Sequence, residues 1–578
     1  MIARRLVFGV AFVLVGCLLA AWVQTAGLRV QVTDIRLQTA EGQQLSALLY
    51  VPASVSEARP GPAVLAVHGY INSRETQSGF AIELARRGFV VLALDQTGHG
   101  YSDPPAFSAG FGGPAGLAYL RGLAFVDPQR IGLEGHSMGG WAVQMAAAAE
   151  PDGYAAMVLA GSSTGTFGAP EGTATHPRNL LLVFSRFDEF SELMWGSPTA
   201  AGITETDKLK TLFGTTEAVV VGRAYGNRYL GTARQLAMPA VTHPGDHLSV
   251  ETIQQTVDWF ETMLEHQSGV QQQTWYWKEL ATLMALVGLF MLVFPLLDLG
   301  LNLFGRALRG QPVKPSIQPL GSRRVAMLLT IVMPVLSFFP LQNLADTWLP
   351  ANPFLPQQIT NGVLLWAWGN GLLTLVLFCV WYRRQANLNL RKCGLVLQAG
   401  QTFAVFKVAL LVFAVLNLVV LLANDWLLVD FRFWVVGLKA MSAMQAGLFL
   451  IYLLPFTAFF LVQSASLHNQ VQCYPNHPGP AMWCNGLVLS SGFVGLLLLQ
   501  YTPLLLGGTL FFASQPLLSI VAFQFVPVLL LAGLVSTYCY HKTGSIYLGA
   551  LLNGLLVTWY LVAGTATQAV PFFWTPAG

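Results

Sequence analysis

Arg130-Ile-Gly-Leu-Glu-Gly-His-Ser-Met-Gly-Gly140 is the stretch that decides the fold of this chain. Its first residues, up to Glu134, form an apolar run typical of a buried strand, and a helix-like run follows from Trp141 to Ala149. The G-x-S-x-G pattern at Gly135–Gly139 therefore falls on a strand-to-helix turn, where glycines permit the tight backbone that exposes a serine hydroxyl. Free N–H groups at the start of the helix would face an oxyanion. We expect Ser137 to be a catalytic nucleophile.

Composition divides the chain into a water-soluble part and a membrane part. Its 578 residues are 54% hydrophobic and 10% charged, whereas charged residues make up roughly a quarter of an ordinary soluble protein. The charged residues are concentrated before Lys278, and the formal net charge of +3 gives no reason to expect nucleic-acid binding. We predict an N-terminal transmembrane anchor over residues 1–28, a globular domain over 29–272 and a multi-span transmembrane domain over 273–578.

The first residues predict a membrane anchor. Arg4 and Arg5 precede an apolar stretch from Leu6 to about Leu28, which is long enough to span a bilayer. The alternatives are a cleaved signal peptide and a lipoprotein with its lipid on Cys17, because Leu14-Val-Gly-Cys17 resembles the bacterial lipobox. We favour an uncleaved anchor, since the apolar run continues past Cys17 and ends at a poor cleavage site. Arg4 and Arg5 would then stay in the cytoplasm, and the globular domain would lie outside it.

The globular domain alternates strand-like and helix-like runs. This alternation predicts an α/β fold, with a mostly parallel sheet and helices on both faces. The first two strands alternate apolar and polar residues, as half-buried antiparallel strands do. Ligands in such sheets bind at the carboxyl ends of the strands. The eight expected strands are Val30–Leu37, Leu45–Val51, Ala63–Val67, Phe89–Leu94, Arg130–Glu134, Tyr154–Ala160, Leu180–Phe184 and Leu236–Val241.

The last two strand ends offer an acid and a base. Asp188 and Glu189 follow the seventh expected strand, and His243 and His247 follow the eighth. A carboxylate at this edge can orient a histidine and stabilise its imidazolium. We expect Asp188 to be the acid, with Glu189 as the alternative. We expect His247 to be the general base, with His243 as the alternative, and Asp246 to cap the closing helix or hold the loop.

Earlier strand ends supply backbone groups and structural turns. The strand at Ala63–Val67 ends in His68-Gly69-Tyr70, so the backbone N–H groups of Tyr70 and Met138 can form an oxyanion hole. We interpret His68 as a structural turn histidine. Asp95, at the end of the next strand, is interpreted as holding a turn through hydrogen bonds to the backbone.

The chain order Ser137, Asp188, His247 is that of one hydrolase fold. Residues from about 30 to 267 resemble the α/β-hydrolase superfamily, especially its dienelactone-hydrolase-like and oligopeptidase-like members. The motifs that carry the resemblance are Val126-Asp-Pro-Gln-Arg-Ile-Gly-Leu-Glu-Gly-His-Ser-Met-Gly-Gly140 and Asp95-x-x-Gly-His-Gly-x-Ser102. The resemblance implies Ser137 as nucleophile, His247 as base, Asp188 as acid, and Tyr70 and Met138 as oxyanion donors.

One departure from the family concerns the substrate pocket. Many members carry a large helical cap after the strand that ends near Ala160, but here Gly161 to Pro177 is a short segment. The longer insertion, Phe190 to Arg234, comes after the acid instead. The pocket therefore cannot be inferred from capped members of the family.

The second half of the chain predicts eight membrane spans, which makes about nine with the anchor. Each apolar block is long enough to cross a bilayer. The stretch Asp430 to Lys439 is ambiguous and is compatible with a segment lying flat in the membrane interface. The blocks are Leu280–Leu301, Val325–Leu344, Val363–Trp381, Phe403–Ala423, Met444–Val462, Met482–Leu506, Leu517–Tyr538 and Ile546–Gly564.

Basic loops set the orientation. Lys and Arg residues gather in the loops after the first and third blocks, whereas the loop between them, Ala345 to Asn361, has none. Positive residues favour the cytoplasmic side, so we expect a multi-pass plasma-membrane protein whose globular domain lies outside the cytoplasm. The basic residues are Arg306, Arg309, Lys314, Arg323 and Arg324 in one loop, and Arg383, Arg384, Arg391 and Lys392 in the other.

These features predict a membrane-bound serine esterase or lipase that acts on an ester or acylated lipid beside the bilayer. The alternatives are a serine peptidase, an acyltransferase, and a transporter or sensor with a hydrolase-like binding domain. No cofactor or metal is expected, because the spacing of the Cys473 and Cys484 pair with nearby histidines matches no standard zinc site. The membrane half contains no H-E-x-x-H motif, and we assign it no chemistry of its own.

Overall fold

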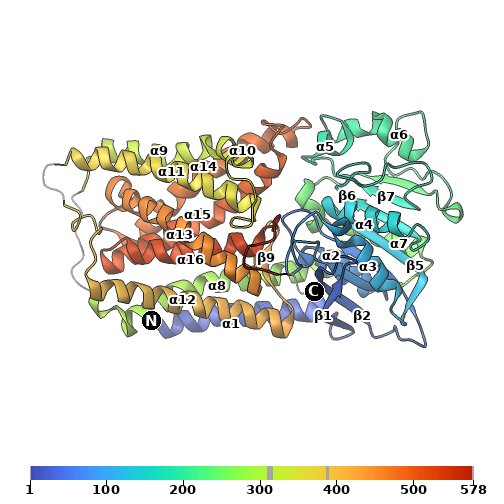
Figure 1. Ribbon diagram of the computed structural model, residues 1–578, viewed down its shortest axis with the longest axis horizontal. Coiled ribbons are helices and arrows are strands. Elements are labelled where there is room, and N and C mark those ends of the chain that lie inside the picture. The colour runs from blue at the N-terminus through green and yellow to red at the C-terminus, as the bar shows by residue number, and fades with distance from the viewer. Residues whose placement is uncertain (1, 309–316, 386–388, 576–578) are drawn as a thin grey trace.

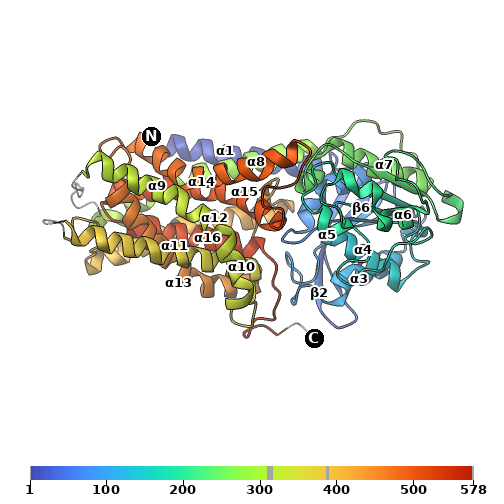
Figure 2. The same cartoon turned by 90° about the horizontal axis from the view of Figure 1, so that it is seen from above.

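The computed structural model describes residues 2–308, 317–385 and 389–575. Figure 1 shows a bundle of long helices lying end to end with an α/β domain, and Figure 2 shows the same arrangement from a second direction. Arg309 and Lys314, which contribute to the expected basic loop, lie outside the described residues.

One eight-stranded sheet forms the centre of the α/β domain. Its strand order is β1-β2-β4-β3-β5-β6-β7-β8. β2 pairs antiparallel with both β1 and β4, and all other neighbours are parallel, which confirms the expected α/β-hydrolase fold with a mostly parallel sheet. The strands are β1 (Val30–Gln38), β2 (Gln44–Pro52), β3 (Gly61–Val67), β4 (Val90–Leu94), β5 (Val126–His136), β6 (Ala156–Ala160), β7 (Leu180–Val183) and β8 (Arg234–Ala237).

Helices cover both faces of this sheet, because its inner strands are apolar on both sides. In β3, Leu65 and Val67 belong to the core beneath α3 (Gly113–Arg121) and α4 (Met138–Ala149). Val64 and Ala66 of the same strand belong to the core beneath α2 (Ser78–Ala85) and α7 (Val250–Met263). Alternate residues of one strand thus enter opposite cores. The insertion between β7 and β8 carries α5 (Ser191–Trp195) and α6 (Asp207–Phe213).

The helical bundle contains eight helices, within the described residues, that are long and apolar enough to cross a membrane. The pair α9 (Leu320–Leu336) and α10 (Phe338–Trp348) bends by 47° and forms a ninth span if counted as one. The chain is therefore a multi-pass membrane protein. The eight helices are α1 (Ile2–Gln24), α8 (Trp275–Leu303), α11 (Gln358–Arg383), α12 (Ala399–Leu427), α13 (Ala443–Ser466, continued to Val471), α14 (Pro478–Leu505), α15 (Pro516–Thr543) and α16 (Tyr547–Gly564).

The N-terminal helix belongs to this bundle. α1 packs lengthwise on α8, and a Cβ atom added at Gly16 would lie 2.6 Å from the Ala281 carbonyl oxygen and 2.7 Å from the Ala285 nitrogen. Gly9 and Gly288 make a similar close approach. Small residues at such contacts let two membrane helices approach backbone to backbone. This packing places α1 among the membrane helices, where an anchor would lie.

The bundle and the α/β domain are joined by a short hairpin. The stretch Asp430 to Lys439 contains β9 (Phe431–Phe433) and β10 (Val436–Leu438), which lead from α12 to α13. Its polar residues bind the α/β domain because buried carboxylates there offer partners: Lys439 Nζ lies 2.9 Å from a Glu75 oxygen, and Arg432 donates to Ser73. The expected interfacial segment is thus a contact between domains.

Candidate active site

Ser137 stands on a strained turn between β5 and α4. Its backbone has φ 54° and ψ −122°, an unfavourable conformation for a residue with a side chain. The flanking glycines are required by space: a Cβ at Gly135 would lie 2.3 Å from the Gly139 carbonyl oxygen, and one at Gly139 would lie 2.0 Å from that of Val67. The pattern therefore folds as the sharp strand-to-helix turn that it predicts.

Asp188 pairs with His243. The Nδ1–H of His243 donates to Asp188 Oδ2 over 2.8 Å, and the other Asp188 oxygen accepts from the Phe190 backbone N–H at 2.8 Å. Both side chains are buried. Asp188 follows β7, and His243 begins the short 3-10 turn after β8, so two neighbouring parallel strands bring them to the same edge. A carboxylate in this position fixes the orientation of the imidazole and stabilises its protonated form.

His247 does not take the place expected for the general base. Its ring forms no ion pair with a carboxylate among the described residues, and it lies in the interior, 4.1 Å from the His136 ring and 6.1 Å from Phe80 between ring centroids. The 3-10 turn from His243 to Leu248 carries it away from Asp188. Burial, with the nearby charges of His243 and Arg432, lowers the pKa of His247 to about 3. The geometry corrects the expected Asp188 partner from His247 to His243.

Glu189, the alternative acid, contacts the histidine loop but not the imidazole. One carboxylate oxygen accepts from the His243 backbone N–H at 2.7 Å, and the other accepts from the Tyr501 hydroxyl at 2.9 Å. Tyr501 lies near the end of α14, so a membrane helix reaches the loop that carries His243. Burial and the neighbouring Asp188 raise the pKa of Glu189 to about 7. The sequence offers no local signal for this link.

Two further side chains hold the His243 loop. Asp246 accepts hydrogen bonds from the hydroxyls of Ser185 and Thr252, so it holds the loop, which was one of its two expected roles. The Nε2–H of His136 donates to the His243 carbonyl oxygen at 3.0 Å. The backbone of His243 is therefore fixed from both sides of the turn.

The charge state of His243 depends on the acids around it. Burial lowers its pKa, but the carboxylates of Asp188, Glu189 and Asp246 outweigh burial and hold the pKa above the ordinary value of 6.5. A histidine of this kind accepts a proton readily and keeps it in a stabilised form, as a general base in acyl transfer requires.

His68 and Asp95, which follow β3 and β4, hold turns through hydrogen bonds, as expected from the sequence. His68 donates from Nδ1 to the Gly69 carbonyl oxygen at 2.7 Å and accepts at Nε2 from the Gln96 N–H at 3.1 Å. Asp95 accepts from the backbone N–H groups of Arg74 and Tyr101 at 2.7 and 3.0 Å. Neither side chain is free to act on a substrate.

Ser137, His243, Tyr70 and Met138 line one cavity of about 450 Å³. This volume lies in the range of small-molecule sites. Its lining is mainly apolar, and among the described residues it includes no Lys, Arg, Asp or Glu. The Tyr70 hydroxyl is held from outside by Gln568, whose Nε2 donates to it at 2.6 Å. A larger hollow of about 600 Å³ among α9, α11 and α13 has none of these four residues in its lining.

The strand order and the turn at Ser137 define an α/β-hydrolase domain, here joined to a multi-span membrane domain. Residues 62–235 match the sequence model of the alpha/beta hydrolase fold.

Cys473 and Cys484 are joined by a disulfide in this structure, so neither offers a thiolate to a metal.

Solved structures and curated sequences with similarity to the chain cover parts of it. The Pyrococcus furiosus esterase Pf2001 is 16% identical, with 42% of this chain and 95% of that chain covered and a TM-score of 0.29. A dienelactone hydrolase from Anabaena variabilis is 18% identical, with 40% and 98% covered and a TM-score of 0.28. The uncharacterized protein Rv2715 of Mycobacterium tuberculosis is 38% identical over 84 residues, which are 14% of this chain and 23% of that protein.

Proposed function

We propose that the protein is a membrane-bound serine hydrolase that cleaves carboxylic esters through an acyl-enzyme. The observation that carries the proposal is the Asp188–His243 hydrogen bond, with His243 and Ser137 in the lining of one apolar cavity. Ser137 is the nucleophile, His243 the general base and Asp188 the residue that orients it. The backbone N–H groups of Tyr70 and Met138 are the oxyanion donors.

Three side chains and two backbone N–H groups carry out the proposed reaction. His243 Nε2 takes the proton of Ser137 as its oxygen attacks the ester carbonyl, and the oxyanion accepts hydrogen bonds from the two backbone N–H groups. His243 then gives its proton to the leaving alcohol. Water, activated in the same way by His243, releases the acid and restores Ser137. Asp188 stays ionised throughout and keeps Nδ1–H in place.

The hydrolase domain is proposed to lie outside the cytoplasm. In Figure 1, α1 begins at the end of the bundle that is farthest from the α/β domain. Arg4 and Arg5 lie at that start, Arg383 ends α11 and Lys542 lies in the last turn of α15. Basic residues mark the cytoplasmic side, so the opposite end, with the hydrolase domain, faces outward.

The chemistry of the cavity supports an ester over a peptide. A peptidase that recognises a free terminus needs a charged partner for it, and four arginines between β6 and β8 that could supply one do not line the cavity. These are Arg178, Arg186, Arg223 and Arg228.

Active-site labelling tests the proposal. Detergent-purified protein is treated with a fluorophosphonate probe and assayed with p-nitrophenyl esters beside aminoacyl-p-nitroanilides. We expect ester cleavage and labelling in the wild type, and loss of both in Ser137→Ala at unchanged expression. If Ser137→Ala were labelled as strongly as the wild type, the assignment of Ser137 as nucleophile would be wrong. Cleavage of anilides alone would mean that the protein is a peptidase and not an esterase.

A further inference from the structure

We infer that the membrane domain forms the acyl-chain subsite of this active site, and that the substrate is an ester with a long apolar acyl chain lying against α15. The inference rests on the proposed ester hydrolysis and adds a binding site that no sequence pattern indicates. Its basis is that the cavity containing Ser137 is closed partly by the α/β domain and partly by the bundle.

Four membrane-domain residues form one wall of the cavity. Val435 comes from the β9–β10 hairpin, and Leu517, Ile520 and Gln524 come from the first turns of α15. The three α15 positions are spaced by three and four residues, so they share one face of the helix. This face is turned toward Ser137 rather than toward the bilayer, although the bundle is otherwise a membrane structure.

The apolar surface continues from the cavity into the bundle. Ile71 and Gln524 line both this cavity and a smaller hollow between α11, α15 and α16. The remaining lining of that hollow is mainly aliphatic and includes Val363, Val521 and Val557. The smaller hollow has a volume of only about 30 Å³, so an acyl chain attached to a carbonyl at Ser137 would lie mainly in the 450 Å³ cavity, between apolar side chains of the α/β domain and those of α15.

Gln524 is the polar member of this wall. Its Oε1 accepts from the Tyr560 hydroxyl at 2.8 Å, and its side chain lines both hollows. The amide N–H groups of Gln524 can donate to an oxygen of the substrate. A fatty-acyl ester with a second oxygen near its carbonyl matches this combination of aliphatic wall and single donor.

Exposed apolar side chains surround the same region. Phe107, Phe167 and Leu193 line the cavity yet are 49%, 66% and 49% exposed. In the segment between α14 and α15, Leu506 is 83% and Phe511 57% exposed. Clusters of exposed apolar residues mark contacts with apolar ligands or membranes. The occupant that suits them is the acyl chain of an ester drawn from the bilayer.

Chain-length kinetics of the full-length protein test the inference. Leu517→Trp and Ile520→Trp fill the proposed subsite, and Leu454→Trp makes the same change on α13, at a position that is 76% exposed and does not line the cavity. Substrates are p-nitrophenyl acetate, butyrate, octanoate and laurate. We expect kcat/KM for laurate to fall about tenfold or more in the two subsite variants, since apolar pockets discriminate methylenes on that scale, while acetate and the control variant stay close to wild type.

The outcomes separate this inference from the proposed function. An equal fall for every chain length, or no change in any, would overturn the subsite. Ile520→Ala supplies an independent test if the tryptophan variants do not fold, because widening the wall should move the preference toward longer chains. Absence of ester cleavage at every length, with no labelling of Ser137 in the wild type, would instead contradict the esterase itself.

A photoreactive probe gives the direct measurement. A fluorophosphonate with a dodecyl chain and a terminal diazirine forms a bond between its phosphorus and the Ser137 oxygen, with fluoride as the leaving group. Irradiation then cross-links the chain end to whatever it contacts. We expect cross-linked peptides from residues 516–528 of α15. Cross-links confined to the insertion between β7 and β8 would place the acyl chain in the α/β domain and overturn the inference.

Discussion

A single hydrogen bond selects the histidine that we propose as the base for Ser137. His243 and His247 lie in one 3-10 turn, but Asp188 contacts His243 at 2.8 Å. We predict that His243→Gln lowers kcat by roughly 10³-fold or more, because proton transfer from the serine is lost. His247→Gln should retain most of the activity, since its ring forms no ion pair with a carboxylate in the described parts of the chain. Ester hydrolysis by the two purified variants checks this.

Size-exclusion chromatography supplies the control for that comparison. Both variants must elute as the wild type does in size-exclusion chromatography, so that a folding defect is separated from a catalytic one. If His247→Gln is the inactive variant and His243→Gln is active, the assignment of the base is wrong.

The same histidine sets the pH dependence. In the proposed mechanism the neutral form of His243 is the base, and nearby carboxylates hold the pKa of His243 above 6.5. Activity should therefore be present at high pH and disappear as the pH falls through that raised pKa. We predict that kcat/KM has an acid limb with a midpoint above 6.5, and that Glu189→Gln moves the midpoint down because one carboxylate is lost. A wild-type midpoint below 6.5 would contradict the charge environment described for His243.

Local sequence patterns predict some of these residues and not others. Ser137 lies in a pattern that specifies its own turn, and Asp188 follows a recognisable strand end. The choice between His243 and His247 depends on the conformation of one short 3-10 turn. The spacing of four residues between the two histidines does not determine that conformation. Tyr501 is 312 positions from Glu189 in the chain, so only the packing of two domains brings them together.

At the scale of elements, the end of α14 holds the catalytic loop. The Tyr501 hydroxyl donates to Glu189, whose other oxygen accepts from the His243 backbone N–H. We predict that Tyr501→Phe lowers kcat about tenfold with little change in KM and alters the pH profile, because a buried carboxylate oxygen loses its donor and the loop loses a restraint. Steady-state kinetics across pH measure both effects.

Tyr452→Phe is the matched control for this change. Tyr452 is also a buried tyrosine of the bundle, and its hydroxyl donates to Asn361 at 2.7 Å, far along the chain from the His243 loop. The Tyr452→Phe variant should be less stable than the wild type but should keep the same pH profile of activity. Identical profiles for Tyr501→Phe and wild type would reduce the α14 contact to a structural role.

The strands and the spans are the elements that the sequence predicts well, since apolar periodicity and length specify them. The bend between α9 and α10 is different. The block Val325–Leu344 is predicted as one span, but the helix bends by 47° near Ser337. Pro334 lies just before the bend, and a proline removes a helix hydrogen bond and crowds the preceding turn. The β9–β10 hairpin has no recognisable sequence pattern, because its position depends on ion pairs with the α/β domain.

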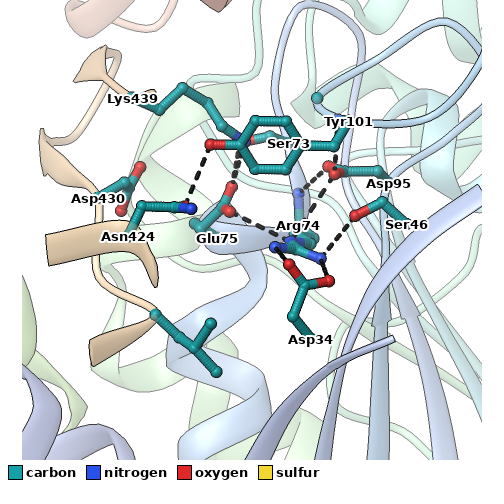
Figure 3. Close-up of polar contacts among 12 residues, drawn as sticks. Asp34, Ser46, Ser73, Arg74, Glu75, Asp95, Tyr101, Asn424, Asp430 and Lys439 are labelled. Carbon is teal, nitrogen blue, oxygen red and sulfur yellow. Dashed lines mark hydrogen bonds and ion pairs between the residues drawn. The ribbon is translucent and has the colours of Figure 1, made fainter. Parts of the chain in front are cut away.

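At the scale of the whole molecule, a buried cluster of charges joins the two domains (Figure 3). Glu75 lies between Lys439 at 2.9 Å, Arg74 at 3.2 Å and Arg432 at 3.8 Å. Burial would raise the pKa of Glu75, but these three cations outweigh burial and hold it well below its usual range. Arg74 is in turn bound by both oxygens of Asp34. Arg432 also pairs with Asp430, so three cations of this cluster face three carboxylates.

Such a balance makes the single change Glu75→Gln costly. It leaves Lys439 buried at the interface without its carboxylate, whereas Arg432 keeps Asp430, and breaking a buried pair from one side typically costs about 3–5 kcal/mol. The control is Glu150→Gln, which breaks the half-exposed Arg121–Glu150 pair of 2.7 Å and should cost about 1 kcal/mol or less. Thermal unfolding of both detergent-purified variants measures the difference.

Loss of this cluster should also change specificity, because the same interface closes the cavity around Ser137. The hairpin carries both Lys439, which holds Glu75, and Val435, which lines the cavity. If docking of the two domains assembles the acyl-chain wall, Glu75→Gln must lose long-chain ester hydrolysis before it loses short-chain hydrolysis as the temperature rises. Parallel loss of both activities would mean that the cluster stabilises the fold while the α/β domain alone selects the substrate.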